Sequence, residues 1–558
     1  MRRPGRRAEV IGLLAGLAVG FCVAGWLVFS GGSAPPPDRA AATATDQPAV
    51  GEGSAGREPD PAALDAEWAA SSDRSGCADW AGGDGISAVR LNSSQLAWFF
   101  SDTYLGPAGP SAGFSRSSGF AHNTVVIQTT AGTGSKFVTM TGGGACTAPG
   151  RPLGPPSSVV APGGPADRYW DEDGVVIGGT VVKFYNRYLP GGVPFIPAGT
   201  AIATFGVAQL SAAGHGPAYG AVARPSTIVL PAYTPPSGGA PIVWGAALLR
   251  SGGTIYVYGT QSPDPAVAAR GLYLARVRDS QLTRFSAWQF YAGDGRWATG
   301  QQNAQPVQPA GSGFSVSSGF SVLQIAGRYW LIQAGVQAGS QDIDAYPAAE
   351  PWGPFGPSAG LVLFRNTDIG LDAAHDYRIM YEARAEPGLS TSHMLVISYN
   401  VNSAGVTTGC VPMSAFTNTV TQPKFITVPV AAFAAPATSG PVQVGPSDYP
   451  QIAVRAPGQW FNGWQYRGGC PPVPGLTGVR TQTRPGAATL TWPDAGLGVR
   501  YQVYLLAPAS GVLRLVKTVQ SDGVTITGLS PGTYQAQVTP ANFRQQTGPP
   551  ARVQFQVP

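Results

Sequence analysis

The sequence predicts an all-β protein, and three observations support this prediction. Of the 558 residues, 76 are Gly and 52 are Pro while only 12% are charged, which is typical of many turns between short strands. The chain also holds 13 Trp, 20 Tyr and 22 Phe, enough aromatic residues to build a large core. Over residues 75–470, an apolar strand, a turn and an aromatic-rich strand recur.

This recurrence predicts a five-bladed β-propeller over residues 75–470. The aromatic-rich strands start 65 to 84 residues apart, and regular repeats of hairpins indicate a propeller or an array. Each unit is long enough for a four-stranded blade with long loops. Stacked β-sandwiches are the alternative, although they do not require five units. The five strands are 96–104, 180–188, 254–261, 328–335 and 393–400.

The N-terminal segment predicts a membrane anchor. Residues 1–9 are basic, with four arginines, and precede a mostly apolar run over 10–29. A helix of that length spans about 30 Å, enough for a bilayer, and the arginines place residues 1–9 in the cytoplasm. We therefore expect a single-pass protein at the cell membrane with an extracytoplasmic domain. Cleavage after Ala34 is the alternative and would release a secreted protein.

Two further features fit an extracytoplasmic protein. Residues 30–74 are rich in Pro, Ala and Gly without hydrophobic periodicity, which predicts a disordered linker. Beyond the anchor the cysteines form an even set, which predicts two disulfides with three pairings open, and nearness in sequence favours the first with the second and the third with the fourth. Their spacings are too long for zinc CxxC pairs, so no metal is predicted. The four are Cys77, Cys146, Cys410 and Cys470.

Composition and motifs argue against several classes of function. The formal net charge of +5 is small for this length and argues against a nucleic-acid partner. The sequence has no P-loop, dinucleotide fingerprint, HExxH zinc signature or Gly-x-Ser-x-Gly elbow, so no cofactor is predicted. We expect a monomer.

A hairpin near residue 93 predicts two opposed carboxylates. In an antiparallel hairpin, facing residues have numbers with a constant sum, so pairing centred on residue 93, within the turn 92–95, sets Asp84 opposite Asp102 if it carries no bulge. Facing Cβ atoms lie about 4.5–5.5 Å apart, and like charges that close raise one pKa. The pair can therefore supply one acid and one base. The alternative is that Asp84 belongs to a turn and Asp102 caps a strand.

The repeats align internally and predict more acidic residues near the propeller axis. Asp84-Gly85 in the first unit corresponds to Asp173-Gly174 in the second, and Asp102 then corresponds to Asn186. Since the innermost strands of a propeller line its channel, we expect Asp171 and Asp173 to join the pair. Glu350, in an aromatic, Pro-stiffened loop, is a further candidate, with a solvated surface glutamate as the alternative.

Other candidate residues fit the recognition of sugars. Sugar rings stack on aromatic rings while their hydroxyl groups need polar partners. Trp170 and Trp244 open the second and third units, and the alternative for each is a place in the core. His122 and Asn123 lie between the first aromatic strands, where a structural histidine is the alternative for His122.

The tail, residues 473–558, resembles a fibronectin type III module. It carries alternating strands that include TLTW (489–492) and YQVYLL (501–506), followed by GLSPGTY (528–534). Trp492 and Tyr534 match the core Trp and the corner Tyr of that module. Such modules act as spacers or adhesive domains, so the resemblance implies no chemistry.

Residues 75–470 resemble a family of secreted five-bladed propellers, long described as domains of unknown function, some of whose relatives are endo-D-arabinanases. The motifs that carry the resemblance are WAGGDG (80–85), WFFSDTYLG (98–106) and HNTVV (122–126), with Tyr169-Trp170 ahead of Asp173-Gly174. The resemblance implies that Asp84 and Asp102 are catalytic carboxylates and that arabinan of cell walls is the substrate.

These observations predict an extracytoplasmic glycoside hydrolase that acts on a cell-wall polysaccharide, because glycosidic hydrolysis needs two placed carboxylates and little else. Asp84 is expected as the acid and Asp102 as the nucleophile or base, with the roles exchangeable. A propeller that binds wall glycan without cutting it is the alternative. A third possibility is an adhesion protein in which Asp84 and Asp102 hold a structural calcium ion.

Overall fold

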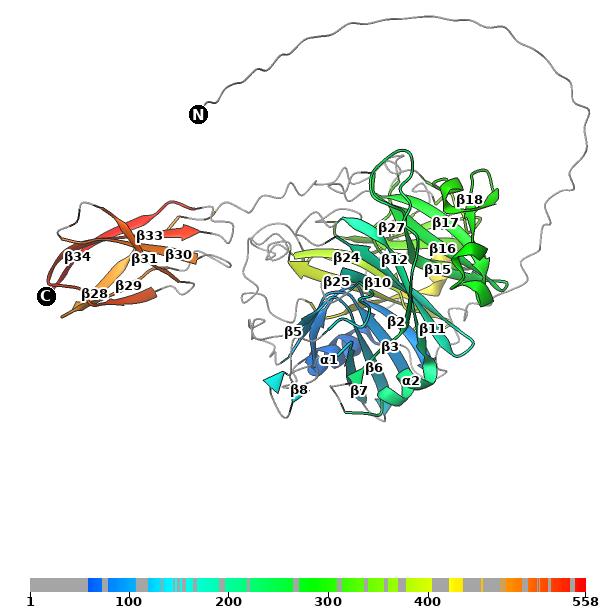
Figure 1. Ribbon diagram of the computed structural model, residues 1–558, viewed down its shortest axis with the longest axis horizontal. Coiled ribbons are helices and arrows are strands. Elements are labelled where there is room, and N and C mark those ends of the chain that lie inside the picture. The colour runs from blue at the N-terminus through cyan, green and yellow to red at the C-terminus, as the bar shows by residue number, and fades with distance from the viewer. Residues whose placement is uncertain are drawn as a thin grey trace, which may run out of the picture. The chain divides into compact units, whose positions relative to one another are not determined.

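The chain is mostly β, as its composition predicts (Figure 1). The fold is described from a computed structural model, over residues 59–72, 79–106, 119–131, 134–143, 146–147, 151–152, 157–163, 168–189, 196–217, 221–263, 270–308, 314–335, 340–355, 360–369, 378–403, 421–434, 453–454, 473, 475–476, 478–493, 500–508, 510, 512–519, 523–541 and 547–558. The predicted membrane segment 10–29 lies outside these residues, as do Cys77, Cys410 and Cys470. None of the helices within the ranges given is long and apolar enough to span a membrane.

Five antiparallel meanders follow one another along the chain. Each predicted aromatic-rich segment forms the second strand of one meander, because its alternating large side chains fill both faces of a buried strand. The first sheet contains β2 (Ser87–Asn92), β3 (Gln95–Phe100), β6 (Thr124–Ala131), β7 (Gly134–Thr141) and the parallel β13 (Ala221–Val222). The second contains β10 (Arg168–Ile177), β11 (Thr180–Tyr188), β12 (Pro197–Gly206) and β14 (Ser226–Val229).

The remaining meanders have the same order. The third sheet contains β15 (Val243–Ser251), β16 (Thr254–Gln261), β17 (Gly271–Arg278), β18 (Gln289–Tyr291) and β19 (Trp297–Thr299). The fourth contains β20 (Ser321–Ile325), β21 (Arg328–Ala334), β22 (Asp342–Ala348), β23 (Leu361–Arg365) and β27 (Ala453–Val454). The fifth contains β24 (Arg378–Ala385), β25 (Met394–Ser403) and β26 (Lys424–Pro429).

Smaller elements complete this part of the chain. A three-stranded sheet contains β1 (Trp80–Gly83), β4 (Thr103–Leu105) and β5 (Gly119–Ala121), and β8 (Cys146–Thr147) pairs with β9 (Arg151–Pro152). The helices are α1 (Pro61–Ser72), α2 (Val207–Ala213) and short 3-10 turns at Asp279–Gln281, Phe285–Ala287, Gln301–Asn303 and Val430–Phe433.

The first strands of the five sheets form a ring. β2 contacts β10, β10 contacts β15, β15 contacts β20 and β20 contacts β24. The ring closes between the fifth and first sheets, where the Ala88 backbone N–H donates to Glu386 Oε2 at 2.9 Å and the Arg90 guanidinium donates to the Gly388 carbonyl. First strands gathered around one axis are the arrangement of a β-propeller.

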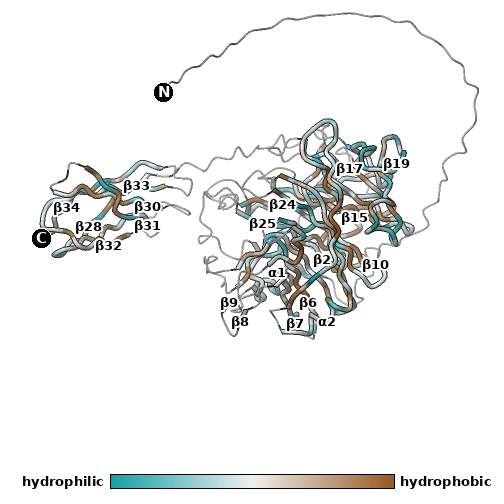
Figure 2. Tube along the Cα trace, viewed as in Figure 1, coloured by the Kyte–Doolittle hydropathy of each residue, from teal (hydrophilic) through white to brown (hydrophobic). Residues whose placement is uncertain are grey.

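Apolar side chains fill each interface between neighbouring sheets. Separate clusters lie between the first and second, second and third, third and fourth, and fourth and fifth sheets. A further cluster joins the first and fifth sheets, where the Trp98 and Phe425 rings lie 5.7 Å apart. Figure 2 shows the hydrophobic residues along the strands. Neighbouring blades therefore pack laterally, and the short parallel pairing of β7 with β13, which lies between β12 and β14 in the chain, adds a backbone link between the first and second meanders.

Helix α1 belongs to the packed structure, whereas residues 30–74 were predicted to be a disordered linker. Asp60 caps the helix, since its Oδ1 accepts from the Ala62 and Ala63 N–H groups at 3.0 and 3.2 Å, and Pro61 occupies the first turn. Trp68 is fully buried, with its ring 4.8 Å from that of Trp80. Only two large apolar residues, Leu64 and Trp68, lie in these twelve, and one pair with helical spacing is too little for the sequence pattern to indicate a helix.

The tail forms a two-layer sandwich of its own. One sheet contains β28 (Arg480–Arg484), β29 (Ala487–Thr491) and β32 (Gly523–Thr527), and the other contains β30 (Arg500–Leu506), β31 (Arg514–Val519), β33 (Gly532–Ala541) and β34 (Ala551–Val557). Trp492 packs in the core beside Tyr501, and the Tyr534 hydroxyl donates to the Ser530 carbonyl at 3.1 Å. These features agree with the predicted resemblance to fibronectin type III modules.

Replacing Trp68 by Ala should destabilise the ring. The substitution empties a site shared by Trp80, Trp98 and Phe100, and truncation of a buried Trp costs about 3–5 kcal/mol. Urea denaturation should show this loss in the free energy of unfolding, with a smaller loss for the matched variant Trp68→Phe. Equal stability of Trp68→Ala and the parent chain would show that α1 does not support the fold.

Candidate active site

The first hairpin brings Asp84 and Asp102 face to face. Gly83 pairs with Thr103 and Ser87 pairs with Phe99, so these paired numbers sum to 186 as predicted. The hairpin is not free of irregularity, because a register shift separates Arg90 from Asn92, which pairs with Gln95. Between these pairs, the Asp84 N–H donates to the Asp102 carbonyl at 3.2 Å and the Ser101 N–H donates to the Asp84 carbonyl at 2.6 Å, so Asp84 lies opposite both residues. Gly85 permits this geometry, because its φ is +64° and a Cβ there would lie 2.0 Å from Ser101 Oγ. The backbone thus sets the two carboxyl groups at the start of the innermost strand.

Asp102 is held as an acceptor of hydrogen bonds. Its Oδ1 accepts from Trp170 Nε1 at 2.9 Å and lies 2.7 Å from His122 Nδ1. An oxygen with two such partners is best matched by a carboxylate and by a His122 tautomer with the proton on Nδ1. The Asp102 side chain is 28% exposed, so it remains accessible to a ligand. Predicted residues from two sheets therefore meet at one carboxylate.

Asp84 has a different environment. The Tyr381 hydroxyl donates to its Oδ2 at 2.6 Å and in turn accepts from Asn402 Nδ2 at 3.1 Å. Burial raises the pKa of Asp84 well above its usual value, and the charge of Asp102 and then that of Glu382 raise it further. The hydrogen bonds from Tyr381 and from the backbone oppose this rise only in part. Asp84 is therefore suited to carry a proton at neutral pH.

Apolar and aromatic side chains lie beside the pair. The Trp170 ring lies 4.3 Å from that of Tyr188, and Phe120 packs against His122 and Tyr104. Three large apolar residues near these segments in the chain are exposed, and the Leu189 N–H donates to the Ile196 carbonyl at 2.9 Å. They are Phe120, Leu189 and Ile196, with exposed fractions of 36%, 43% and 36%. The site thus combines carboxyl groups with an apolar rim, as the binding of sugar rings requires.

Asp171 belongs to a buried layer of charges instead of the exposed site. Its carboxylate pairs with Lys183 at 3.0 Å, and Glu172 pairs with Arg384 at 2.7 Å, all nearly without exposure. Burial raises the pKa of Asp171 to about 6 and that of Glu172 to about 7, against the opposing cations. A bulge between Asp171 and Gly174 shifts the strand, so Asn186 faces Trp170 and not Asp173.

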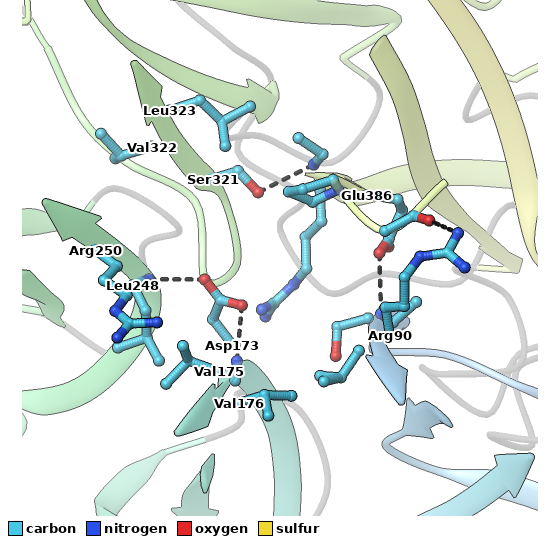
Figure 3. A pocket seen from close by; sticks show the side chains of 18 of the residues that line it. Arg90, Asp173, Val175, Val176, Leu248, Arg250, Ser321, Val322, Leu323 and Glu386 are labelled. Carbon is cyan, nitrogen blue, oxygen red and sulfur yellow. Dashed lines mark hydrogen bonds between the residues drawn. The ribbon is translucent and has the colours of Figure 1, made fainter. Parts of the chain in front are cut away.

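Asp173 lines a separate cavity of about 220 Å³ in the channel (Figure 3). Its two oxygens accept from the N–H groups of Gly174 and Leu248, each at 2.7 Å. Figure 3 shows Arg90, Arg250 and Glu386 around the same space. Residues of all five first strands line this cavity, and neither Asp84 nor Asp102 is among them. Asp173 therefore belongs to this cavity and not to the Asp84–Asp102 pair.

Three predicted ligand contacts are not supported. Asn123 is fully buried, with Nδ2 donating to the Val160 and Tyr169 carbonyls, so it ties two segments together. Trp244 is 1% exposed and packs in the core beside Phe290. Glu350 is exposed, but it comes just after β22, the third strand of its sheet. The last residue of β22, Ala348, pairs with Tyr329, which lies beside the turn between β20 and β21. Glu350 therefore lies at the opposite end of the ring from Asp84.

No sequence pattern indicated that four residues would lie in or beside the channel, namely Tyr381, Glu382, Lys183 and Arg384. A signal was nevertheless present for the charged residues, because Glu382 and Arg384 lie in the interior of a first strand and Lys183 in the interior of β11, which is unusual in a chain with so few charges. Interpreting it required knowing that β24 lies next to β2, some 300 residues earlier in the chain. Among the residues in the ranges given above, no group of three His, Cys, Asp or Glu side chains is placed to hold a metal ion.

The ring of sheets and the opposed carboxyl groups define a propeller-like β protein with an acidic site at one end of its channel. Residues 72–440 match the family described as Domain of unknown function (DUF5005), and the chain belongs to that family. None of the curated proteins compared with the chain matches it.

Solved structures with a similar fold are distant in sequence. A candidate hydrolase from Bacteroides ovatus is 19% identical with a TM-score of 0.48, covering 64% of this chain and 88% of its own. An exo-1,5-alpha-L-arabinanase from a bovine ruminal metagenomic library is 11% identical with a TM-score of 0.32, covering 63% and 94%. A fibronectin type-III domain of a human protein is 17% identical with a TM-score of 0.14, covering 16% and 92%. The similarity to glycoside hydrolases is therefore distant.

Replacing Glu386 by Gln should reduce the pH dependence of stability. Burial raises the pKa of Glu386 to about 8, so the folded state keeps a proton that the unfolded state releases above its ordinary value of 4.5. The resulting stabilisation is complete below pH 4.5 and is lost as the pH rises through about 8. Gln can keep both hydrogen bonds, to the Ala88 N–H and to Ser398.

Urea denaturation at pH 5 and pH 8 measures this effect. The free energy of unfolding of Glu386→Gln should fall less between these values than that of the parent chain. A part of the fall remains in both proteins, because Asp171 and Glu172 also have raised pKa values. An identical fall in both proteins would contradict a protonated Glu386.

Proposed function

We propose that the protein is an extracytoplasmic glycoside hydrolase, with a five-bladed β-propeller that acts on a cell-wall polysaccharide. One observation carries the proposal, namely the facing of Asp84 and Asp102 in environments that favour opposite protonation states. An acid and a base, or an acid and a nucleophile, on the two sides of a glycosidic bond are what its hydrolysis needs. The resemblance of the first-blade motifs to relatives of endo-D-arabinanases supports arabinan as the polymer and endo action as the mode.

In this mechanism Asp84 is the general acid. Tyr381 donates to Oδ2, which leaves Oδ1 to carry the proton toward the glycosidic oxygen. As the bond between that oxygen and the anomeric carbon breaks, the proton passes from Asp84 to the departing oxygen and Asp84 becomes a carboxylate. The sugar that departs is thus released as a neutral alcohol.

Asp102 acts on the anomeric carbon. It either bonds to this carbon, after which water activated by Asp84 releases the sugar, or it takes a proton from the attacking water. Hydrogen bonds from Trp170 and His122 fix its orientation and stabilise its charge. Trp170 and His122 therefore act as positioning residues through Asp102, and the rim of Phe120, Leu189 and Ile196 offers apolar surface to adjoining sugar rings.

The setting of the enzyme follows from the N-terminal pattern. We propose a monomer tethered to the membrane by residues 10–29, with release after cleavage as the alternative and the wall polysaccharide as its partner. The tail is a spacer or an adhesive module in this proposal, since its core residues carry no chemistry.

Asp84→Asn and Asp102→Asn should each lower turnover while the fold is retained. Loss of a general acid or base costs about 10²–10⁴ in rate, and the double variant should release no oligosaccharide. The measurement is release of oligosaccharides from purified arabinogalactan and other wall glycans by the full chain. Asp294→Asn is the matched control, because this exposed aspartate has φ 53°, which Asn adopts readily.

Full activity in both single variants would contradict the proposal. Binding of glycan without release by the parent chain would favour a carbohydrate-binding propeller instead. If the parent chain neither binds glycan nor releases oligosaccharides, the result would favour an adhesion protein.

A further inference from the structure

Glu382 adopts a backbone conformation that glutamate rarely accepts. Its φ is 50°, in the left-handed region, where a side chain crowds the backbone and costs free energy. It lies in β24 at a bulge, since Tyr381 pairs with Asn400 while Arg384 pairs with Ser398. A strained residue of this kind persists only where the surrounding structure enforces it, and such residues concentrate at functional sites.

The side chains around this bulge contact different partners. Tyr381 reaches Asp84, and Arg384 reaches Glu172 in the buried layer. Glu382 lies between them, half-buried, with Oε1 accepting from Ser318 Oγ at 2.7 Å. Its Oε2 has no hydrogen-bond partner among the described residues. A carboxylate held at one oxygen leaves the other available to a ligand.

The charge of Glu382 acts on the candidate acid, whose partner Tyr381 is its neighbour in the chain. Burial raises the pKa values of Asp84, Tyr381 and Tyr188, and the negative charge of Glu382 contributes to each rise. The ionisable groups acting on Asp84 are Asp102, Tyr381 and Glu382, and Tyr104 in turn responds to the charges of Asp102 and Asp84. Asp102 itself is fixed by His122. Of the two carboxylates that act on Asp84, Glu382 is the one that comes from the fifth sheet, and its Oε2 is available to a ligand.

We propose that Glu382 is a third functional carboxylate of the site, which binds a substrate hydroxyl through Oε2. Its negative charge also favours the protonated form of the neighbouring acid. This inference rests on the proposed function, because it gives Glu382 a role in binding the sugar on which the proposed hydrolase acts. The ligand class is a polyhydroxylated sugar, since a carboxylate accepts hydrogen bonds from hydroxyl groups. The strain at φ 50° is then the condition that aims Tyr381 and Glu382 at the same space.

A purely structural role would give different results. In that case Glu382 would serve to hold Ser318, and its charge would not matter to Asp84. Glu382→Gln separates the two, because Gln keeps the size and an oxygen for Ser318 but removes the charge. Glu350→Gln is the matched control, an exposed glutamate at the other end of the ring.

The first readout needs no substrate. Titration of the Asp84 carboxyl by ¹³C NMR on the full chain, assigned by its absence in Asp84→Asn, should show a lower pKa in Glu382→Gln than in the parent chain. The sign follows because removal of a nearby negative charge makes ionisation of Asp84 easier. The pKa should be unchanged in Glu350→Gln. An unchanged pKa of Asp84 in Glu382→Gln would overturn the electrostatic part of the inference.

The second readout is hydrolysis of wall glycan. In Glu382→Gln, kcat/KM should fall about tenfold to a hundredfold, the loss expected for one hydrogen bond to a charged group. The alkaline limb of its pH profile should move to lower pH, since Asp84 loses its proton earlier. Unchanged kcat/KM and an unchanged pH profile would overturn the inference, even if the Asp84→Asn/Asp102→Asn variant is inactive.

Glu382→Gly tests the strain. Glycine adopts φ 50° without crowding, so Tm should stay the same or rise while activity falls. A large fall in Tm would instead show that Glu382 stabilises the fold. If the parent chain hydrolyses no glycan, the proposed function fails, and the titration of Asp84 still decides whether Glu382 controls its proton.

Discussion

The backbone register of the first hairpin is the constraint on which the site depends. It places Asp84 and Asp102 on opposed strand ends, and Gly85 allows the chain to pass Ser101 at a distance that no other residue permits. Trp170 from the second sheet and Tyr381 from the fifth then reach the pair from either side. Because β1 and β2 also belong to the closure of the ring, the geometry of the carboxyl groups is tied to the integrity of the whole fold.

Charge buried within the channel distinguishes this ring from a purely apolar core. Lys183 and Arg384 pair with Asp171 and Glu172, and Glu386 joins the first and fifth sheets while it keeps a raised pKa. Buried ion pairs contribute little net stability, but the loss of one partner is costly. Such pairs therefore fix the relative positions of the first strands. The same strands carry bulges that direct Glu172, Asp173 and Glu382 to different levels of the channel.

Local patterns in the sequence predicted the parts of the fold and site that depend on neighbouring residues. The aromatic-rich second strands and the pairing across residue 93 follow from alternation and turn chemistry within about 20 residues. Trp244 and Asn123 look like ligand contacts in sequence, yet their burial depends on packing between blades that no local pattern reveals. Tyr381 and Glu382 were missed because a bulge and the closure of the ring, not sequence distance, bring them to Asp84.

The position of one proton decides the account. Neutron diffraction from crystals of the protein at neutral pH would locate it, because deuterium scatters strongly where X-rays do not show hydrogen. If Asp84 is the acid and Asp102 the base, deuterium lies on the Asp84 carboxyl and on His122 Nδ1, and none lies on Asp102. Deuterium on Asp102 with none on Asp84 would contradict the assignment of acid and base from which the proposed function follows.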